Sequence, residues 1–240
     1  MKRTMNTATI QAAAAPDAGL QGQRVLVFRT LTLVAMVLLA AAYISPIWWV
    51  SLKAPNYPPE TFPDGVRIHF HVDGVKNGCQ LRTNKEVVED EPLDCVHEMN
   101  TINHYIGMEP IDSGAKLELL LAPYAFALVG LMLAAFLVYR GPFWWLLPLG
   151  AIAVPVGFVI DYSFWLWWFG HNLHPWGAFT VKPFMPTVFG EGKVAQFSTF
   201  SYPHYGFLLM VGGGLAAALA LLIRRKQLAE DPQSQGRTAS

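Results

Sequence analysis

The chain has 240 residues, of which 53% are hydrophobic and 14% are charged, whereas about a quarter of the residues in soluble domains are charged. Its basic and acidic residues balance, so the formal net charge at pH 7 is zero. These values exclude an ordinary soluble domain and indicate a membrane protein. We therefore expect contacts with the lipid bilayer and no nucleic acid partner.

Four apolar stretches are long enough to cross a bilayer, because a spanning helix needs about 20 residues. We predict an all-α membrane fold with four transmembrane helices, an outer segment that contains a small β-hairpin, and a second outer loop. The predicted spans are residues 24–50, 117–140, 143–169 and 205–223.

Basic residues flank the predicted spans on one side of the membrane, at Arg24, at Arg140 and at residues 224–226. Cytoplasmic loops carry an excess of Lys and Arg, so we expect both termini to be cytoplasmic. This orientation gives cytoplasmic tails at residues 1–23 and 224–240 and outer segments at residues 51–116 and 170–204.

The first tail shows no apolar periodicity, so residues 1–23 are expected to be disordered. The long span that follows has no A-x-A-like site after it and indicates an anchor rather than a cleaved signal peptide. Trp48 and Trp49 at its end are expected in the aromatic belt at the membrane surface.

A strand is predicted where hydrophobic and polar residues alternate, over residues 66–73. Asp73 and Gly74 then favour a hairpin turn. His69 and His71 share one face of this strand, where they either chelate a metal ion or face solvent.

The two cysteines, Cys79 and Cys95, enclose a polar insert in the first outer segment. In an oxidising compartment a disulfide is the simplest arrangement, and a pair of thiolate metal ligands is the alternative. No CxxCH motif is present, which argues against covalently bound c-type haem.

Residues 95–112 combine histidine with methionine, and imidazole and thioether groups suit copper. Further donors occur in the second outer loop, so the sequence predicts a tentative copper site on the outer side. Alternatively, histidines collect there only because the outer loops are the longest polar segments. The candidate ligands are His97, Met99, His104, Met108, His171, Met185 and His204.

Asp161 is the clearest acidic residue deep in a predicted span, and ionisable groups at such positions are often functional. The equal alternative is that Asp161 is only a hydrogen-bonding partner for a hydroxyl, amide or histidine in the same helix bundle. The glycines at 212–214 in the last span are explained by close helix packing.

Four segments carry a resemblance to a known family: SLKAPNYPPE, NTINHYIGMEPI, FGHNLHPWGAFTV and KPFMPTVFGEGKVAQFSTFSYP. In this order they resemble the small four-span proteins found in bacterial gene clusters for nitrous oxide reductase and its copper-delivery factors. The resemblance covers residues 46–223 and implies an inner-membrane accessory to the maturation of a periplasmic copper enzyme. The matching residues are Asn103, His104, Tyr105, Gly107, Met108, Gly170, His171, Asn172 and Met185.

The chain departs from that family in two places. The insert between Cys79 and Cys95 is longer than expected, with His97 and Met99 beside it, and His174 stands where the family often has an acidic residue. These donors predict either a specialised copper site or a local elaboration closed by a disulfide.

Two functions follow as hypotheses. The first is an accessory protein that assists copper delivery, with a copper enzyme or a copper chaperone as its partner. The second is a structural subunit of a larger membrane complex, such as a copper-dependent membrane monooxygenase, without a metal site of its own. An enzyme is least expected, because HExxH, nucleophile-elbow, P-loop and dinucleotide motifs are absent from the sequence.

Overall fold

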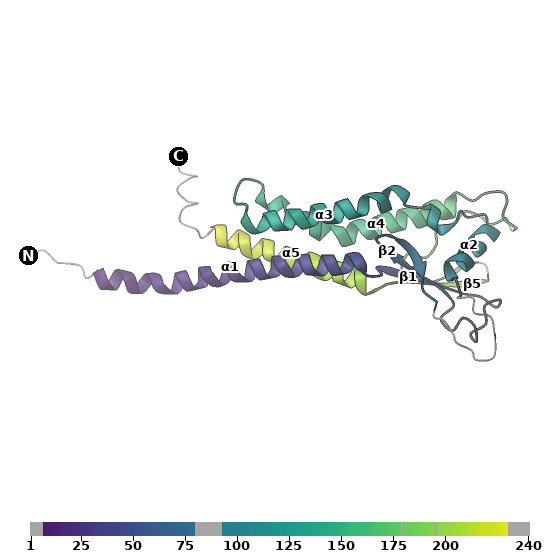
Figure 1. Cartoon of the computed structure of the whole chain (residues 1–240), viewed down its shortest axis with the longest axis horizontal. Helices are drawn as coiled ribbons and strands as arrows, with labels where there is room; N and C mark the ends of the chain where they lie inside the picture. Colours follow the sequence, from purple (N-terminus) through teal and green to yellow (C-terminus); the bar gives the residue numbers. More distant parts are fainter. Residues whose placement is uncertain (1–6, 80–92, 179, 195, 230–240) are drawn as a thin grey trace, which may run out of the picture.

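The computed structural model describes residues 7–79, 93–178, 180–194 and 196–229 of the chain. Long helices run side by side, and a small antiparallel sheet with a short helix lies at one end of them (Figure 1). We call this the sheet end and the opposite end of the helices the tail end. The long helices are α1 (Thr7–Ile44), α3 (Lys116–Val138), α4 (Leu149–His171) and α5 (Tyr205–Ala229).

In the described residues, four helical segments are long and apolar enough to cross a membrane. They agree with the predicted helical membrane protein. The third begins at the short 3-10 helix η2 (Trp144–Leu146) that precedes α4. The segments are Gly19–Ile44, Lys116–Val138, Trp144–His171 and Tyr205–Ala229.

The helices α1 and α5 pack closely because the glycines of α5 carry no side chain at the contact. A Cβ atom at Gly213 would lie 3.1 Å from Cγ of Leu39, and one at Gly214 would lie 3.3 Å from the carbonyl oxygen of Ala151 in α4. Larger residues would push the three helices apart, which supports the packing role expected for these glycines.

Both ends of the first predicted span differ from the structure. The helix ends at Ile44, because Pro46 disfavours the α conformation of the residue before it. Residues 48–50 belong to a strand instead of the span. At the other end α1 begins at Thr7, so the expectation of a disordered tail is wrong for residues 7–23; alanine-rich sequence has a high helix propensity. Residues 1–6 lie outside the described residues.

The predicted hairpin is part of a five-stranded antiparallel sheet with the strand order β3-β2-β1-β5-β4. The turn between β2 and β3 consists of Val72 and Asp73, one residue earlier than predicted, because His71 pairs with Gly74, the first residue of β3. The second outer loop, for which we predicted no strands, supplies β4 and β5. The strands are β1 (Trp48–Lys53), β2 (Val66–His71), β3 (Gly74–Asn77), β4 (Gly190–Val194) and β5 (Phe197–Pro203).

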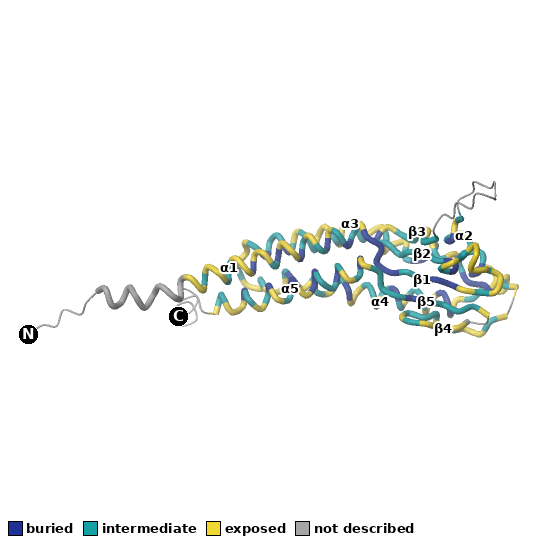
Figure 2. The backbone as a smooth tube through the Cα atoms, turned by 90° about the horizontal axis from the view of Figure 1, so that it is seen from below, coloured by how far each residue is buried: buried dark blue, intermediate teal, exposed yellow. Residues whose placement is uncertain are grey.

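The paired strands β1 and β5 are connected directly to the closely packed helices α1 and α5. Strand β1 follows α1 and β5 leads into α5, so packing of the two helices brings the strands together with Trp48 opposite Pro203. Figure 2 shows buried residues along β1, between β2 and β5. This pairing joins segments about 150 residues apart in the chain, which is why local sequence patterns do not reveal it.

Trp48 lies in the protein interior and not in a membrane-surface belt, because its side chain is 3% exposed. Its Nε1 donates a hydrogen bond to Oγ of Ser201 at 2.8 Å, and Tyr162 of α4 shares the same hydroxyl at 3.2 Å. The Ser201 hydroxyl in turn donates to the carbonyl oxygen of Val188. One serine therefore ties β1, β5, α4 and the segment before β4 together.

The short helix α2 (Cys95–Tyr105) covers one face of the sheet, and the 3-10 helix η1 (Ile111–Ser113) then leads into α3. The side chain of Asp94 caps α2 by accepting hydrogen bonds from the backbone N–H groups of Val96 and His97. Cys79 and Cys95 are joined by a disulfide with their Cα atoms 6.0 Å apart. This bond holds the first turn of α2 to the segment after β3.

We predict that the double variant Cys79→Ser/Cys95→Ser has a free energy of unfolding about 3 kcal/mol lower than the parent, because the unfolded chain loses a covalent loop constraint. Thermal unfolding in detergent would measure the change. Reductant should lower the stability of the parent by a similar amount and leave the variant unaffected; equal stability of parent and variant would contradict the prediction.

Candidate functional site

Histidines mark the sheet end of the molecule. All seven histidines of the chain lie there, outside the central parts of the long helices. Strand β2 carries two, α2 carries two, and the others lie at the end of α4, in the loop after it and directly before α5. They are His69, His71, His97, His104, His171, His174 and His204.

The two outer segments fold against one another at the end of α2. The backbone N–H of His174 donates to the carbonyl oxygen of Gly107 at 2.7 Å, and that of Ala178 donates to the carbonyl oxygen of Tyr105 at 2.9 Å. These bonds join the motif after α2 to the loop after α4. The two outer segments are thus in contact, as the copper hypothesis requires.

Glycines make this junction possible. Gly107 has φ of +80°, which residues with a Cβ atom rarely adopt, and a Cβ atom there would collide with the carbonyl oxygen of His174. Gly177 packs against the backbone of Gly107, where a Cβ atom would lie 2.8 Å from the amide nitrogen. Two motif residues therefore act by permitting close backbone contact.

A cluster that we call the Trp176 stack forms beside this junction from His104, Glu109, His174 and Trp176. The ring of His174 lies on the indole with centroids 3.8 Å apart and planes 8° apart. The ring of His104 also stacks on the indole, at 6.3 Å and 17°. Two imidazoles from segments far apart in the chain thus lie at one aromatic side chain.

Glu109 orients one imidazole of the Trp176 stack. Its Oε1 lies 2.8 Å from Nε2 of His174. A proton on Nε2 donates to the carboxylate, so the neutral ring keeps its lone pair on Nδ1. Carboxylates orient many metal-binding histidines in this way. The contact with Glu109 therefore fixes the orientation of the His174 ring through Nε2 and leaves Nδ1 outside it.

Two of the predicted sulfur ligands lie in the interior. Met99 is 4% exposed and packs among the residues between α2 and the sheet, and Met108 is 8% exposed and packs against Ile106 and Phe169. Both line a small apolar cavity of about 90 Å³. Met185 is instead 45% exposed, on the loop before β4.

The other predicted ligands are dispersed. His97 is exposed on α2, away from the C-terminal turn that carries His104. His171 is exposed, with its Nδ1 2.9 Å from the carbonyl oxygen of Trp167 and its ring stacked on that indole. The structure therefore does not bring His97 or His171 into the Trp176 stack.

His204 pairs with a histidine of β2 instead of with His104. The rings of His69 and His204 lie 5.1 Å apart, and Nδ1 of His204 accepts a hydrogen bond from the backbone N–H of Tyr205. Binding a metal ion through this Nδ1 would require that bond to break, at a net cost of about 1 kcal/mol.

Burial keeps this histidine pair uncharged. Burial, with His204 and Arg67, lowers the pKa of His69 to about 4. Burial also lowers the pKa of His204, with Arg67 as the second cause, and the pKa of His71, with Lys76 as the second cause. At neutral pH the three rings are therefore neutral, which is the form that binds metal ions.

In the parts of the chain that the structure describes, histidine, cysteine, aspartate and glutamate side chains do not gather in groups of three or more that could hold a metal ion. Two imidazoles at the Trp176 stack and two at the His69–His204 pair are the available donor sets.

Comparison of the chain with protein-family models and with curated proteins found no match. The placement in the nitrous oxide reductase cluster family remains a prediction from the motifs.

Sequence patterns missed Glu109 and Trp176 as parts of the candidate site. Trp176 follows His174 by two residues in a loop, where neighbouring side chains have no fixed relation, and Glu109 lies in a turn. The motif spacing drew attention to His104 and Met108, but the pairing of His104 with Trp176 depends on how the two segments meet.

We predict that Gly107→Ala lowers the free energy of unfolding by about 1–3 kcal/mol, because alanine adopts this backbone conformation poorly and meets the His174 carbonyl oxygen. Thermal unfolding in detergent would measure it. The matched control is Gly130→Ala in α3, where a Cβ atom has nothing within 4 Å and helix propensity improves. Equal effects of the two substitutions would argue against the junction.

A third prediction concerns pH. Because the pKa of His69 falls from 6.5 to about 4 on folding, the unfolded chain binds more protons in this range, and stability should fall as the pH drops from 6.5 towards 4. His69→Gln should weaken this dependence, measured as unfolding temperature against pH. His97→Gln on α2 is the control and should show the same dependence of unfolding temperature on pH as the parent. If His69→Gln also showed that dependence, the prediction would be wrong.

Proposed function

We propose that this chain is a multi-pass inner-membrane accessory protein that assists copper delivery to, or maturation of, a periplasmic copper enzyme of the nitrous oxide reductase type. The observation that carries the proposal is the Trp176 stack, in which the junction of the two outer segments gathers His104 and His174 on one indole. The motif resemblance supports the same function.

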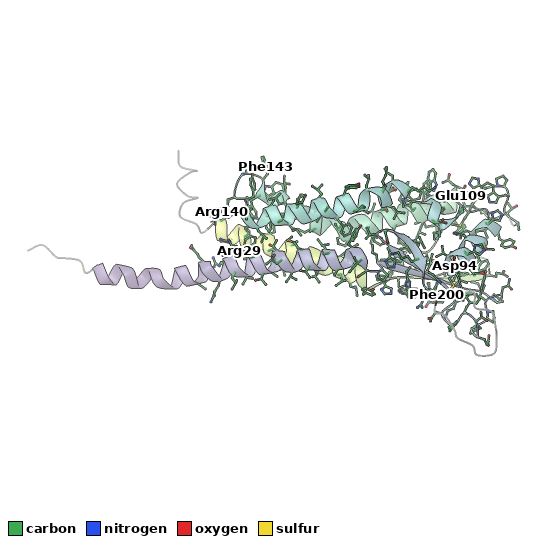
Figure 3. The ribbon with its side chains drawn as sticks, in the orientation of Figure 1. Arg29, Asp94, Glu109, Arg140, Phe143 and Phe200 are labelled. Atoms are coloured by element: carbon green, nitrogen blue, oxygen red, sulfur yellow. A yellow bond between two sulfur atoms is a disulfide. The ribbon has the colours of Figure 1, made fainter. Side chains whose placement is uncertain are left out.

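The proposal assigns the sheet end to the periplasm and both termini to the cytoplasm. A disulfide at the sheet end fits an oxidising compartment. Basic residues such as Arg29 and Arg140 lie towards the tail end (Figure 3), as expected for the cytoplasmic side.

Copper is the cargo in this proposal. His104 is exposed, and His174 keeps a lone pair on Nδ1 because Glu109 takes up the other ring nitrogen. Met185 offers a further exposed thioether on the loop that carries His174. An exposed site with few ligands can both receive a copper ion from one partner and release it to another.

The second candidate function, a structural subunit of a larger membrane complex, is favoured by the surface of α3. Among the residues of this helix, Leu133 and Phe136 are buried, and most of its other side chains face outward. An apolar groove of about 480 Å³ between α1 and α3 would admit a helix of another subunit or a lipid chain.

We predict that the purified full-length protein retains Cu(I) after loading under reducing conditions and buffer exchange, and that His104→Ala/His174→Ala loses most of it. Glu109→Gln should weaken copper binding about tenfold, because it frees the ring that the carboxylate orients. Metal analysis of each sample gives the copper content per chain.

The matched control is His69→Ala/His204→Ala, which removes two imidazoles from the other pair and should leave the copper content unchanged. If the control lost copper and His104→Ala/His174→Ala did not, the copper site would lie at the His69–His204 pair and not at the Trp176 stack. A parent protein that binds no copper and migrates with a stoichiometric partner in native mass measurements would support the structural subunit instead.

A further inference from the structure

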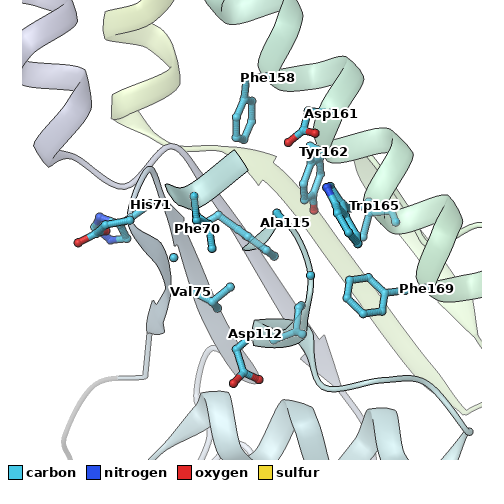
Figure 4. Close-up of a pocket in the computed structure, with 16 residues that line it drawn as sticks. Phe70, His71, Val75, Asp112, Ala115, Phe158, Asp161, Tyr162, Trp165 and Phe169 are labelled. Carbon is cyan, nitrogen blue, oxygen red and sulfur yellow. The ribbon is translucent and has the colours of Figure 1, made fainter. Parts of the chain in front are cut away.

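A cavity at the sheet end lies between α4, the β2–β3 hairpin and the segment that leads from η1 into α3 (Figure 4). Its volume is about 340 Å³, within the range of small-molecule sites. The predicted copper ligands do not line it, so it is separate from the Trp176 stack.

One wall of the cavity is a single face of α4. Spacings of three and four residues put Phe158, Asp161, Tyr162, Trp165 and Phe169 on the same side of the helix, and all of them line the cavity. Figure 4 shows these side chains facing the space between α4 and the strands. The wall is therefore aromatic, with one carboxylate among the rings.

The aromatic wall is held rigidly. Tyr162 is buried and shares a hydrogen bond with Ser201 at 3.2 Å. Its ring stacks on Phe158 at 5.9 Å and meets the edge of Phe70 from β2 at 5.3 Å. A ligand would thus meet a preformed surface, which reduces the ordering that binding requires.

The charged groups that line the cavity are acidic, apart from the neutral ring of His71. Asp73 pairs with Lys76 at 2.8 Å, and Asp112 accepts a hydrogen bond from Asn100 at 2.9 Å. Asp161 forms no ion pair with the residues that the structure describes.

A second carboxylate strengthens the negative potential at Asp161. Glu118, in the first turn of α3, acts on Asp161 through its charge. The two carboxylates repel one another, and a cation bound at Asp161 would relieve this repulsion. An acid at this depth in a helix bundle is costly unless something positive accompanies it.

We propose that this cavity binds an amphipathic organic cation, with an ammonium group at Asp161 and an apolar body against the aromatic wall. The rings of Tyr162 and Trp165 attract a cation through their faces, and Phe158 and Phe169 bury apolar surface. A bare metal ion fits less well, because aromatic carbon and one free carboxylate offer it few ligands. A purely apolar ligand would leave the Asp161 charge without a partner.

The test is calorimetric titration of the full-length protein, in an uncharged detergent, with benzyltrimethylammonium. Neopentylbenzene, which has the same shape without the charge, is the matched probe. The cation should bind more tightly than the neutral probe. Asp161→Asn should weaken cation binding about tenfold, the effect of losing one partly buried charge pair, and leave the neutral probe unchanged.

The control variant is Glu191→Gln, which removes the same charge from the exposed strand β4 and should leave cation affinity unchanged. Equal binding of the two probes by the parent, absence of cation binding, or unchanged affinity in Asp161→Asn would each overturn the proposal. The comparison of probes on the parent decides the question even if Asp161→Asn does not fold.

A last arm asks whether the natural cation is a lipid headgroup or a free amine. The titration is repeated in nanodiscs that contain the same fraction of phosphatidylglycerol, with either phosphatidylethanolamine, whose headgroup is an ammonium, or an uncharged glycolipid as the remainder, so that the surface charge is equal. Weaker probe binding in the presence of phosphatidylethanolamine means that the lipid competes for the cavity. Equal binding in both nanodiscs assigns the cavity to a free cation.

Discussion

The hydroxyl of Ser201 is the contact on which the architecture of the sheet end depends. It accepts a hydrogen bond from Nε1 of Trp48 and donates one to the carbonyl oxygen of Val188. Because its single proton is used for Val188, the hydroxyl of Tyr162 is the donor in the bond at 3.2 Å. The serine thus uses its full hydrogen-bonding capacity, and three buried polar groups are satisfied at one point.

This contact couples the long apolar helices to the sheet. Trp48 begins the strand that follows α1, Ser201 lies in the strand that leads into α5, and Tyr162 belongs to α4. The sheet therefore cannot shift relative to the helices without breaking buried hydrogen bonds. Both candidate sites depend on this rigidity, since each combines residues from α2 or α4 with residues from the loops and strands at the sheet end.

The two candidate sites have different chemistry. The Trp176 stack is exposed and offers imidazole nitrogens, one of which is oriented by a carboxylate, so it suits a soft metal ion in transit. The cavity beside Asp161 has aromatic walls and an acid without a cationic partner in the described residues.

Local patterns in the sequence were enough to predict the long apolar helices, a strand that begins at Val66 with a hairpin turn after it, and a disulfide as the simplest pairing of the cysteines. Each depends on residues close together in the chain, where periodicity, turn chemistry or loop closure acts directly. They could not reveal that Trp48 is interior, that β5 pairs with β1, or that His204 faces His69 while His104 stacks on Trp176. Those contacts join segments far apart in the chain, and only the packing of α1 on α5 and the docking of the loop after α4 onto α2 decided which side chains met.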